Sequence, residues 1–349
     1  MTSRALVYRQ IPEAEPIAGK DIVVETVTFD RDAAPPAGGL IVQLLYASYD
    51  PYLRNRMKAP ETAQGFATFT PGVTIPNFNI VKVLKSDHPT FKAGDVLNGF
   101  GLIQEYFALS PDEIKGYKLL KNPYNLDQRF FLGPTGPSGL AAYSSLLEIG
   151  QPKAGETILI TAASGAIGQI VGQIAKQRGL MVLGTVGSDE KLDLLINQLG
   201  FDGGINWKKG NLVENLKRIA PQGVDILYDS VSGPLFEAAI DVLKLKARVV
   251  ACGYASQYNV PPEKQYGIRN MGTMIKKRVT WRGFDTDLTD FAGKYVDEHV
   301  EVVSKWIHDG SFKPLLDVTY GMENAAEGLA KLTRGSNVGK ALLDVTYKA

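Results

Sequence analysis

Glu156–Gly179 reads ETILITAASGAIGQIVGQIAKQRG, and its hydrophobic period changes midway from that of a strand to that of a helix. Ile158–Ile160 is a continuous apolar run, which favours a strand buried on both faces. After the glycines, apolar residues recur at helical spacing from Ile167 to Ala175. The stretch therefore predicts a strand, a tight turn and a helix, which is the repeating pattern of parallel α/β sheets.

The turn between strand and helix, AASGAIG at residues 162–168, has the spacing of a dinucleotide-binding fingerprint with alanine in its first position. The first glycine would let the backbone approach a pyrophosphate, and the second would let helix and strand pack closely. The N–H groups that open a helix attract such an anion. We therefore predict a nucleotide site, with a tight turn that binds nothing as the alternative. The expected cofactor contacts are Ala163, Gly165, Ala166, Ile167 and Gly168.

The composition limits the class of protein. A chain of 349 residues exceeds what one hydrophobic core usually organises, which predicts two domains. With 38 basic and 37 acidic residues, the net charge of +1 offers no overall field for nucleic acid or an anionic membrane. There is no run of eighteen apolar residues, and the start, MTSRALVYRQIPE, lacks the apolar core of a signal peptide. We expect a soluble cytoplasmic protein without nucleic-acid or membrane partners.

Residues that bind metals are scarce. Cys252 is the only cysteine, and the histidines are His88, His299 and His308. One chain with this set cannot build a disulfide, a four-thiolate zinc site or a catalytic zinc site with two thiolates. We therefore expect activity without a metal, and we interpret His88 as an ordinary loop histidine.

The pattern around the fingerprint indicates two kinds of domain. Residues 1–127 contain short β-type runs separated by turns rich in proline and glycine. From 128 to 310, strands and helices alternate, which predicts a doubly wound α/β domain with six parallel strands and ligands at their carboxyl ends. Its last elements are expected to be a strand at 279–284 and a long helix at 288–309. Residues 311–349 return to shorter pieces and end in a strand, so we expect this tail to rejoin the first domain.

One loop of the first domain combines aromatic and charged residues. The stretch LLYASYDPYLRNRM, residues 44–57, leaves a strand at Pro51 and places Tyr52 close to two arginines. Such a loop is able to line a pocket, although a tyrosine more often packs its ring and exposes its hydroxyl. Both interpretations of Tyr52 stay open at this point.

The second predicted strand spans residues 180–187, and the residues at its end and just after it bear on the choice of cofactor. NAD-binding folds usually place an acidic residue here to accept the ribose hydroxyls. This chain has Gly187 instead, and the hydroxyl of Ser188 and the ammonium of Lys191 favour an additional phosphate. Asp189 is the alternative, either as a ribose acceptor or as an acid in the first helical turn. We favour NADPH.

The chain resembles the zinc-independent medium-chain dehydrogenase/reductase superfamily, and within it the alkenal/prostaglandin reductases and plant double-bond reductases. Besides the stretches quoted above, the resemblance rests on GLAAYSSLLEIGQPKAGET, LGFDGGINWK, ACGYASQYN and NVGKALLDV, so that it spans nearly the whole chain. It implies a GroES-like β-rich catalytic domain closed by the C-terminal tail, a Rossmann domain with six strands, NADPH as hydride donor, no metal, and often a homodimer.

The resemblance also implies roles for single residues. Tyr258 matches a tyrosine near the enone oxygen, Tyr52 matches one that lines the substrate pocket, and Lys191 matches the lysine that binds the 2′-phosphate. Asn337 matches an asparagine near the nicotinamide. Further cofactor contacts are expected at Gly187, Ser188, Trp207, Ser230, Cys252 and Tyr258.

Three stretches depart from the family pattern. The usual GMPGLTAY is GPSGLAAY at 136–143, the usual asparagine after the aromatic–aspartate pair is Ser230, and the usual tyrosine of INYK is Trp207. We expect Trp207 to stack near the adenosine, but it offers no phenol to the phosphate.

The implied reaction transfers a hydride to the β-carbon of an α,β-unsaturated aldehyde or ketone, after which the α-carbon gains a proton. Negative charge develops on the carbonyl oxygen, and without zinc the Tyr258 hydroxyl and the cofactor's ribose hydroxyl are suitable donors to it. A quinone reductase is the alternative enzyme. An NADPH-binding protein without turnover is the alternative among non-enzymes.

Overall fold

The computed structural model describes residues 2–63, 65–286 and 290–347, and the chain divides into two compact units. Unit 1 takes in the chain up to Leu132, Leu316–Asn337 and the residues from Ala341 onward, whereas unit 2 takes in Gly133–Leu315 and Val338–Lys340. The junctions thus lie at 132/133 and 315/316, where the sequence predicted 127/128 and 310/311.

Unit 1 is β-rich. One sheet has the strand order β2-β1-β4, and a second runs β15-β16-β3-β5-β6-β8 with β7 paired to β3. Its strands are β1 (Thr2–Tyr8), β2 (Ile22–Thr28), β3 (Leu40–Ser48), β4 (Val73–Thr74), β5 (Pro76–Ser86), β6 (Val96–Leu102), β7 (Tyr106–Leu109), β8 (Lys118–Leu119), β15 (Leu316–Tyr320) and β16 (Lys340–Asp344). Its helices are α1 (Leu53–Arg56), α2 (Pro111–Ile114) and α10 (Ala325–Thr333).

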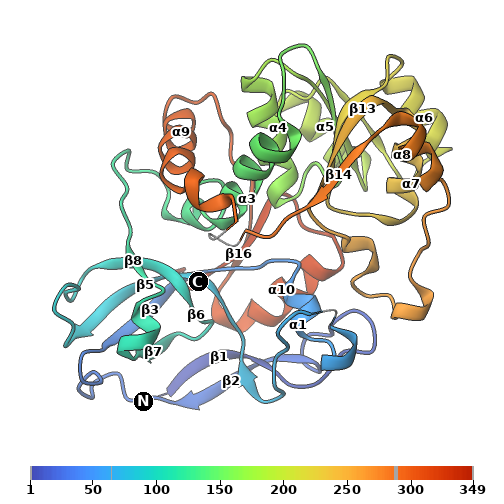
Figure 1. Cartoon of the computed structure of the whole chain (residues 1–349). Coiled ribbons are helices and arrows are strands. Elements are labelled where there is room, and N and C mark those ends of the chain that lie inside the picture. Colours follow the sequence, from blue (N-terminus) through green and yellow to red (C-terminus); the bar gives the residue numbers. More distant parts are fainter. Residues whose placement is uncertain (1, 64, 287–289, 348–349) are drawn as a thin grey trace. The chain divides into compact units, whose positions relative to one another are not determined.

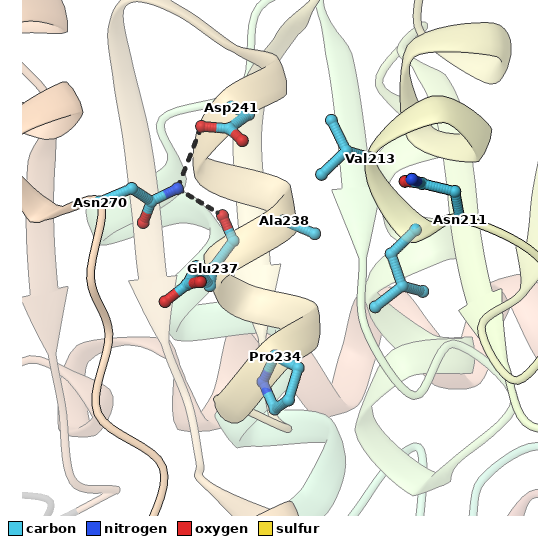
Figure 2. A pocket seen from close by; sticks show the side chains of 8 residues that line it. Asn211, Val213, Pro234, Glu237, Ala238, Asp241 and Asn270 are labelled. Atoms are coloured by element: carbon cyan, nitrogen blue, oxygen red, sulfur yellow. Dashed lines mark hydrogen bonds between the residues drawn. The ribbon is translucent and has the colours of Figure 1, made fainter.

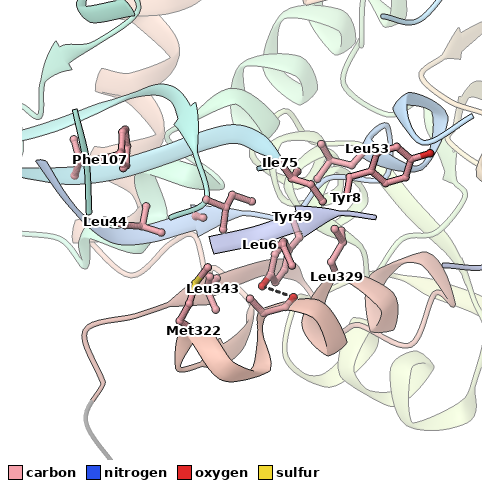
Figure 3. Close-up of a cluster of buried hydrophobic side chains, with 14 of the residues drawn as sticks. Leu6, Tyr8, Leu44, Tyr49, Leu53, Ile75, Phe107, Met322, Leu329 and Leu343 are labelled. Atoms are coloured by element: carbon pink, nitrogen blue, oxygen red, sulfur yellow. Dashed lines mark hydrogen bonds between the residues drawn. The ribbon is translucent and has the colours of Figure 1, made fainter. Parts of the chain in front are cut away.

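The end of the chain completes the core of unit 1. Strand β16 pairs antiparallel with β3, and Leu343 lies buried in the same cluster as Leu6 and Leu44. Tyr49 of this core, labelled in Figure 3, donates its hydroxyl to the carbonyl oxygen of Ala325 at the start of α10, at 2.9 Å. Segments more than 270 residues apart in sequence therefore share one hydrophobic core.

Unit 2 contains a six-stranded sheet with the order β11-β10-β9-β12-β13-β14, and its pairings are parallel. Its strands are β9 (Thr157–Ile160), β10 (Met181–Val186), β11 (Gly203–Asn206), β12 (Val224–Asp229), β13 (Leu243–Ala251) and β14 (Thr280–Gly283), of which the last two lie side by side in Figure 1. Its helices are α3 (Pro137–Ser145), α4 (Ala166–Gln177), α5 (Asp189–Asn197), α6 (Leu212–Ile219), α7 (Gly233–Val242), α8 (Met271–Lys277) and α9 (Val296–His308). This order confirms the predicted doubly wound fold.

The central strand β9 is buried on both faces, as its apolar run predicted. Ile158 and Ile160 belong to one hydrophobic cluster, whereas Leu159 between them belongs to another. Because alternate residues of a strand point to opposite faces, the two clusters lie on the two sides of the sheet. The order of the sheet reverses direction at β9, and this is the point at which such sheets bind ligands.

The predicted long helix at 288–309 is shorter in the structure. Helix α9 begins only at Val296, after a single 3-10 turn at Ala292–Tyr295, and residues 287–289 lie outside the described part of the chain. Gly293 gives a physical reason, because glycine inside a helix costs about 1 kcal/mol relative to alanine.

Candidate active site

The fingerprint turn has the geometry that a pyrophosphate needs. Gly165 precedes α4 in an extended conformation, and among the residues that the structure describes no side chain caps this helix start. A Cβ on Gly168 would stand 2.5 Å from the carbonyl oxygen of Ala162, so only glycine lets the helix approach the turn this closely. The open N–H groups at Ala166 and Ile167 can therefore bind an anion.

The segment just after Asn337 pairs through its backbone with the fingerprint turn. Gly339 pairs with Gly165, and its backbone N–H donates to the carbonyl oxygen of Ser164 at 2.7 Å. Asn337 lies two residues earlier in the chain. Its predicted contact with the nicotinamide stays a prediction.

The acidic residue after β10 is paired with side chains at the end of β11 and just after it. Asp189 forms an ion pair with Lys209 and accepts a hydrogen bond from Asn206 Nδ2 at 2.9 Å. Ser188 is the N-cap of α5, and its Oγ accepts from the backbone N–H of Lys191 at 3.3 Å. The predicted hydroxyl is thus engaged in the helix start, and Lys191 lies in the first turn of α5.

A buried aspartate connects the carboxyl ends of β9 and β12. Asp229 accepts hydrogen bonds from Thr161 Oγ1 at 2.7 Å and from two backbone N–H groups, and burial still raises its pKa to about 6. The backbone N–H of Ser230 donates to Thr161 Oγ1 at 2.9 Å. This network fixes Ser230 at the strand end, and neither Thr161 nor Asp229 was predicted from the sequence.

The structure brings Ser230, Cys252 and Tyr258 together. The backbone N–H of Cys252 donates to the carbonyl oxygen of Asp229 at 2.8 Å. A Cβ on Gly253 would stand 3.2 Å from the Ser230 carbonyl oxygen and 3.3 Å from Tyr258 Oη. Burial raises the pKa of Tyr258, so its hydroxyl keeps its proton at neutral pH and is able to donate.

Tyr52 lies in unit 1, and its hydroxyl proton is already used. Asn77 Nδ2 donates to the Ser48 carbonyl oxygen at 2.7 Å and to an Asp50 carboxylate oxygen at 3.0 Å, and these two groups are acceptors only. Asn77 Oδ1 must therefore face Tyr52, whose hydroxyl donates to it. In this arrangement the Tyr52 oxygen accepts hydrogen bonds from other groups but has no proton to give them.

A buried histidine contacts the turn just before GPSGLAAY, a stretch that forms the start of α3. His299 Nε2 lies 2.8 Å from the carbonyl oxygen of Pro134, which can only accept, so this nitrogen carries the hydrogen. His299 is 1% exposed, and burial lowers its pKa to about 4. His299 is therefore neutral at neutral pH and donates to the turn that precedes α3.

The low pKa of His299 should make the protein sensitive to acid. The pKa in an unfolded chain is about 6.5, so the unfolded state binds more protons between pH 6.5 and 4. The stability that His299 contributes is complete above pH 6.5 and falls as the pH drops towards 4, by at most about 1.4 kcal/mol per pH unit. Thermal unfolding followed across this range should show a smaller acid loss for His299→Gln, which keeps a donor for Pro134. The exposed His308→Gln is the matched control, and equal acid loss in all three proteins would contradict this account.

A surface cavity of about 360 Å³ lies between α6 and α7 and includes none of the predicted site residues. Figure 2 shows that Asn270 Nδ2 donates to the Glu237 carbonyl oxygen and to Asp241. Since no predicted site residue lines this cavity, it does not belong to the candidate active site.

In residues 2–63, 65–286 and 290–347, no three His, Cys, Asp or Glu side chains gather in a way that would hold a metal ion. In the same ranges no helix combines the length and the apolar character needed to cross a membrane.

Comparison with known proteins gives matches over the whole chain. Residues 20–116 match the family described as "N-terminal domain of oxidoreductase", and 166–298 match "Zinc-binding dehydrogenase". "NADP-dependent oxidoreductase RED1" of Cochliobolus heterostrophus is 42% identical over 98% of this chain and 97% of its own length. "2-alkenal reductase (NADP(+)-dependent)" of Nicotiana tabacum is 36% identical, covering 93% of each chain. The structure of CurA with NADPH from Vibrio vulnificus is 28% identical with a TM-score of 0.89, covering 99% of this chain and 100% of that one.

Proposed function

Because this chain belongs to the zinc-independent medium-chain dehydrogenases/reductases that act as NADP-dependent double-bond reductases, we propose that it reduces the carbon–carbon double bond of an α,β-unsaturated aldehyde or ketone. The chain is an NADP-dependent oxidoreductase, and NADPH is its cofactor. The single observation that best supports the substrate class is the half-buried Tyr258, whose protonated hydroxyl lies near the carboxyl ends of β12 and β13.

The residues of unit 2 suit NADPH. The uncapped start of α4 offers N–H groups to the pyrophosphate, and Gly168 permits the close approach of helix and turn. NADPH supplies a hydride when it is bound. The protein has to orient the substrate, exclude water and stabilise the charge that appears on the substrate's carbonyl oxygen.

We assign that stabilising role to Tyr258. Its hydroxyl is protonated at neutral pH, and the edge-on contact between its ring and that of Tyr254, at 4.7 Å between centroids, restrains its orientation. Proton delivery to the α-carbon can come from Tyr258, from the ribose hydroxyl or from water.

Tyr52 takes a different part in this proposal. Since its proton is given to Asn77, Tyr52 does not serve as a proton donor to the substrate oxygen. We propose that its ring and its free lone pair line the substrate pocket and orient the substrate. Tyr52 is thus a positioning residue, whereas Tyr258 is the catalytic one.

The proposal includes no metal, although one of the matching families is described by zinc binding. Cys252 is the only cysteine, and burial raises the pKa of its thiol, which disfavours the thiolate that would bind zinc.

A homodimer is also part of the proposal. Strand β14 ends the sheet of unit 2 with all four residues exposed, which leaves an edge that a second copy is able to cover.

A substrate panel tests this function. The purified protein is mixed with NADPH and with enals, enones and quinones in turn, and the loss of NADPH absorbance is followed. We expect turnover with enals or enones to exceed that with quinones. A clear preference for quinones would favour the quinone reductase, and tight NADPH binding without oxidation by any compound would favour a binding protein without turnover.

A further inference from the structure

Two consecutive residues after β12 have a positive φ, and they pack against the segment that carries Tyr258. Ser232 has φ 62° and ψ −157°, a conformation that essentially only glycine adopts without strain. Gly233 follows with φ 65°, and a Cβ on it would stand 2.8 Å from Ser256 Oγ and 3.0 Å from Gln257 Nε2. The chain is therefore held in a strained conformation at the point where it approaches the residues just before Tyr258.

The carboxylate of Asp229, which is 4% exposed, holds this turn. Its Oδ1 accepts from the backbone N–H of Val231 at 3.2 Å, and its Oδ2 accepts from that of Ser232 at 3.0 Å. Thr161 Oγ1 donates to Oδ1 at 2.7 Å and accepts from the backbone N–H of Ser230 at 2.9 Å. The strained residue Ser232 is thus tied by its own N–H to a buried acceptor, which opposes its relaxation to a commoner conformation.

The same turn supports the end of the neighbouring strand, β13, through its carbonyl groups. The carbonyl oxygens of residues 229–231 accept, in order, from the backbone N–H groups of Cys252, Ala255 and Ser256, at 2.8, 3.1 and 3.1 Å. The backbone N–H of Tyr258 donates in turn to the carbonyl oxygen of Ala255, at 3.4 Å. Tyr258 therefore belongs to a segment whose backbone is fixed by the turn that Asp229 holds.

We propose that Asp229 positions Tyr258 for the reaction, because its carboxylate fixes the strained turn to which the segment carrying Tyr258 is hydrogen-bonded. This inference rests on the role proposed above for Tyr258. A donor stabilises a developing oxyanion only when it lies at hydrogen-bond distance from that oxygen, so a small shift of Tyr258 has a large effect. Asp229 is thus a positioning residue, whose own oxygens are occupied by Thr161, Val231 and Ser232.

Asp229→Asn tests the proposal, because an amide has only one acceptor oxygen. If that oxygen stays with Thr161 and Val231, the amide nitrogen faces the Ser232 N–H and this bond is lost. The rate of enone reduction is measured in a single turnover with saturating NADPH, at a pH above the Asp229 pKa of about 6. The rate should fall by about 10-fold. Adding Ser232→Gly to Asp229→Asn should restore most of the loss, since glycine adopts the turn without strain.

A double-mutant cycle with Tyr258→Phe shows whether Asp229 acts through Tyr258. In the Tyr258→Phe background, Asp229→Asn should lower the rate by less than about 2-fold, because the donor that it positions is already absent. Equal losses in both backgrounds would overturn the proposal. A full rate in Tyr258→Phe would overturn the proposed role of Tyr258 and this inference with it. A large loss in Tyr258→Phe, with none in Asp229→Asn, would refute this inference alone.

The matched control is Asp225→Asn, because Asp225 lies near the other end of β12 and pairs with Lys244. This variant should keep nearly the full rate. Thr161→Val serves if Asp229→Asn does not fold, since it removes a donor to Asp229 and leaves the carboxylate in place. It should lower the rate by about 3-fold, and Thr161→Ser, which keeps the hydroxyl, should lower it less. An unchanged rate in Thr161→Val would contradict the proposal.

Discussion

Tyr258→Phe should lower the turnover of a good enone substrate by on the order of 100-fold, because removal of one preorganised donor to a developing oxyanion has an effect of this size. The ring of Tyr258 is restrained by Tyr254, and burial keeps its hydroxyl protonated at neutral pH. Phenylalanine keeps the ring and its packing. The loss should therefore appear in turnover, and the dissociation constant for NADPH should stay the same.

Single-turnover measurements under saturating NADPH separate this effect from cofactor binding. Tyr266→Phe is the matched control, since its hydroxyl donates to Glu237 at 3.1 Å, beside the separate surface cavity. That variant should keep nearly full turnover. If Tyr258→Phe also kept full turnover, the stabilising role would belong to the ribose hydroxyl alone.

Lys191→Ala should weaken NADPH by about 10- to 150-fold and hardly change the affinity for NADH. A hydrogen bond to a charged group is worth roughly 1.5–3 kcal/mol, and this range corresponds to that loss. Lys191 lies in the first turn of α5, four residues after Gly187. NADH has no 2′-phosphate, so it has no such interaction to lose.

Titration of both cofactors against the unmodified protein and the variant decides the role of Lys191. An equal loss for NADPH and NADH would show that Lys191 supports the pocket in general. No loss for either would place it on the solvated helix face, and Ser188 with other basic residues would then have to account for the preference.

The fold was predictable because its signals are local. The apolar run at Ile158–Ile160, the glycines of the fingerprint and the helical spacing after them all lie within one short stretch. The alternation that follows predicted the six-stranded parallel sheet. The predicted start of the last helix of unit 2 was wrong, because α9 begins only at Val296, after Gly293.

The candidate site was predictable only in part, because its remaining contacts join distant segments. Tyr52 is next to the charged residues that drew attention to it, yet its actual partner is Asn77 on β5. His299 meets Pro134 across 165 positions. Asp229 meets Thr161 only through the pairing of β9 with β12, and no spacing rule in the sequence shows this contact.

The central claim is that a hydride reaches the β-carbon of an unsaturated carbonyl compound. The most direct test uses NADPH that carries deuterium at its transferable position, with an enone from the panel as substrate and magnetic resonance of the product as readout. The account predicts a saturated ketone with deuterium on the former β-carbon. Deuterium on the carbonyl carbon of an allylic alcohol would contradict it.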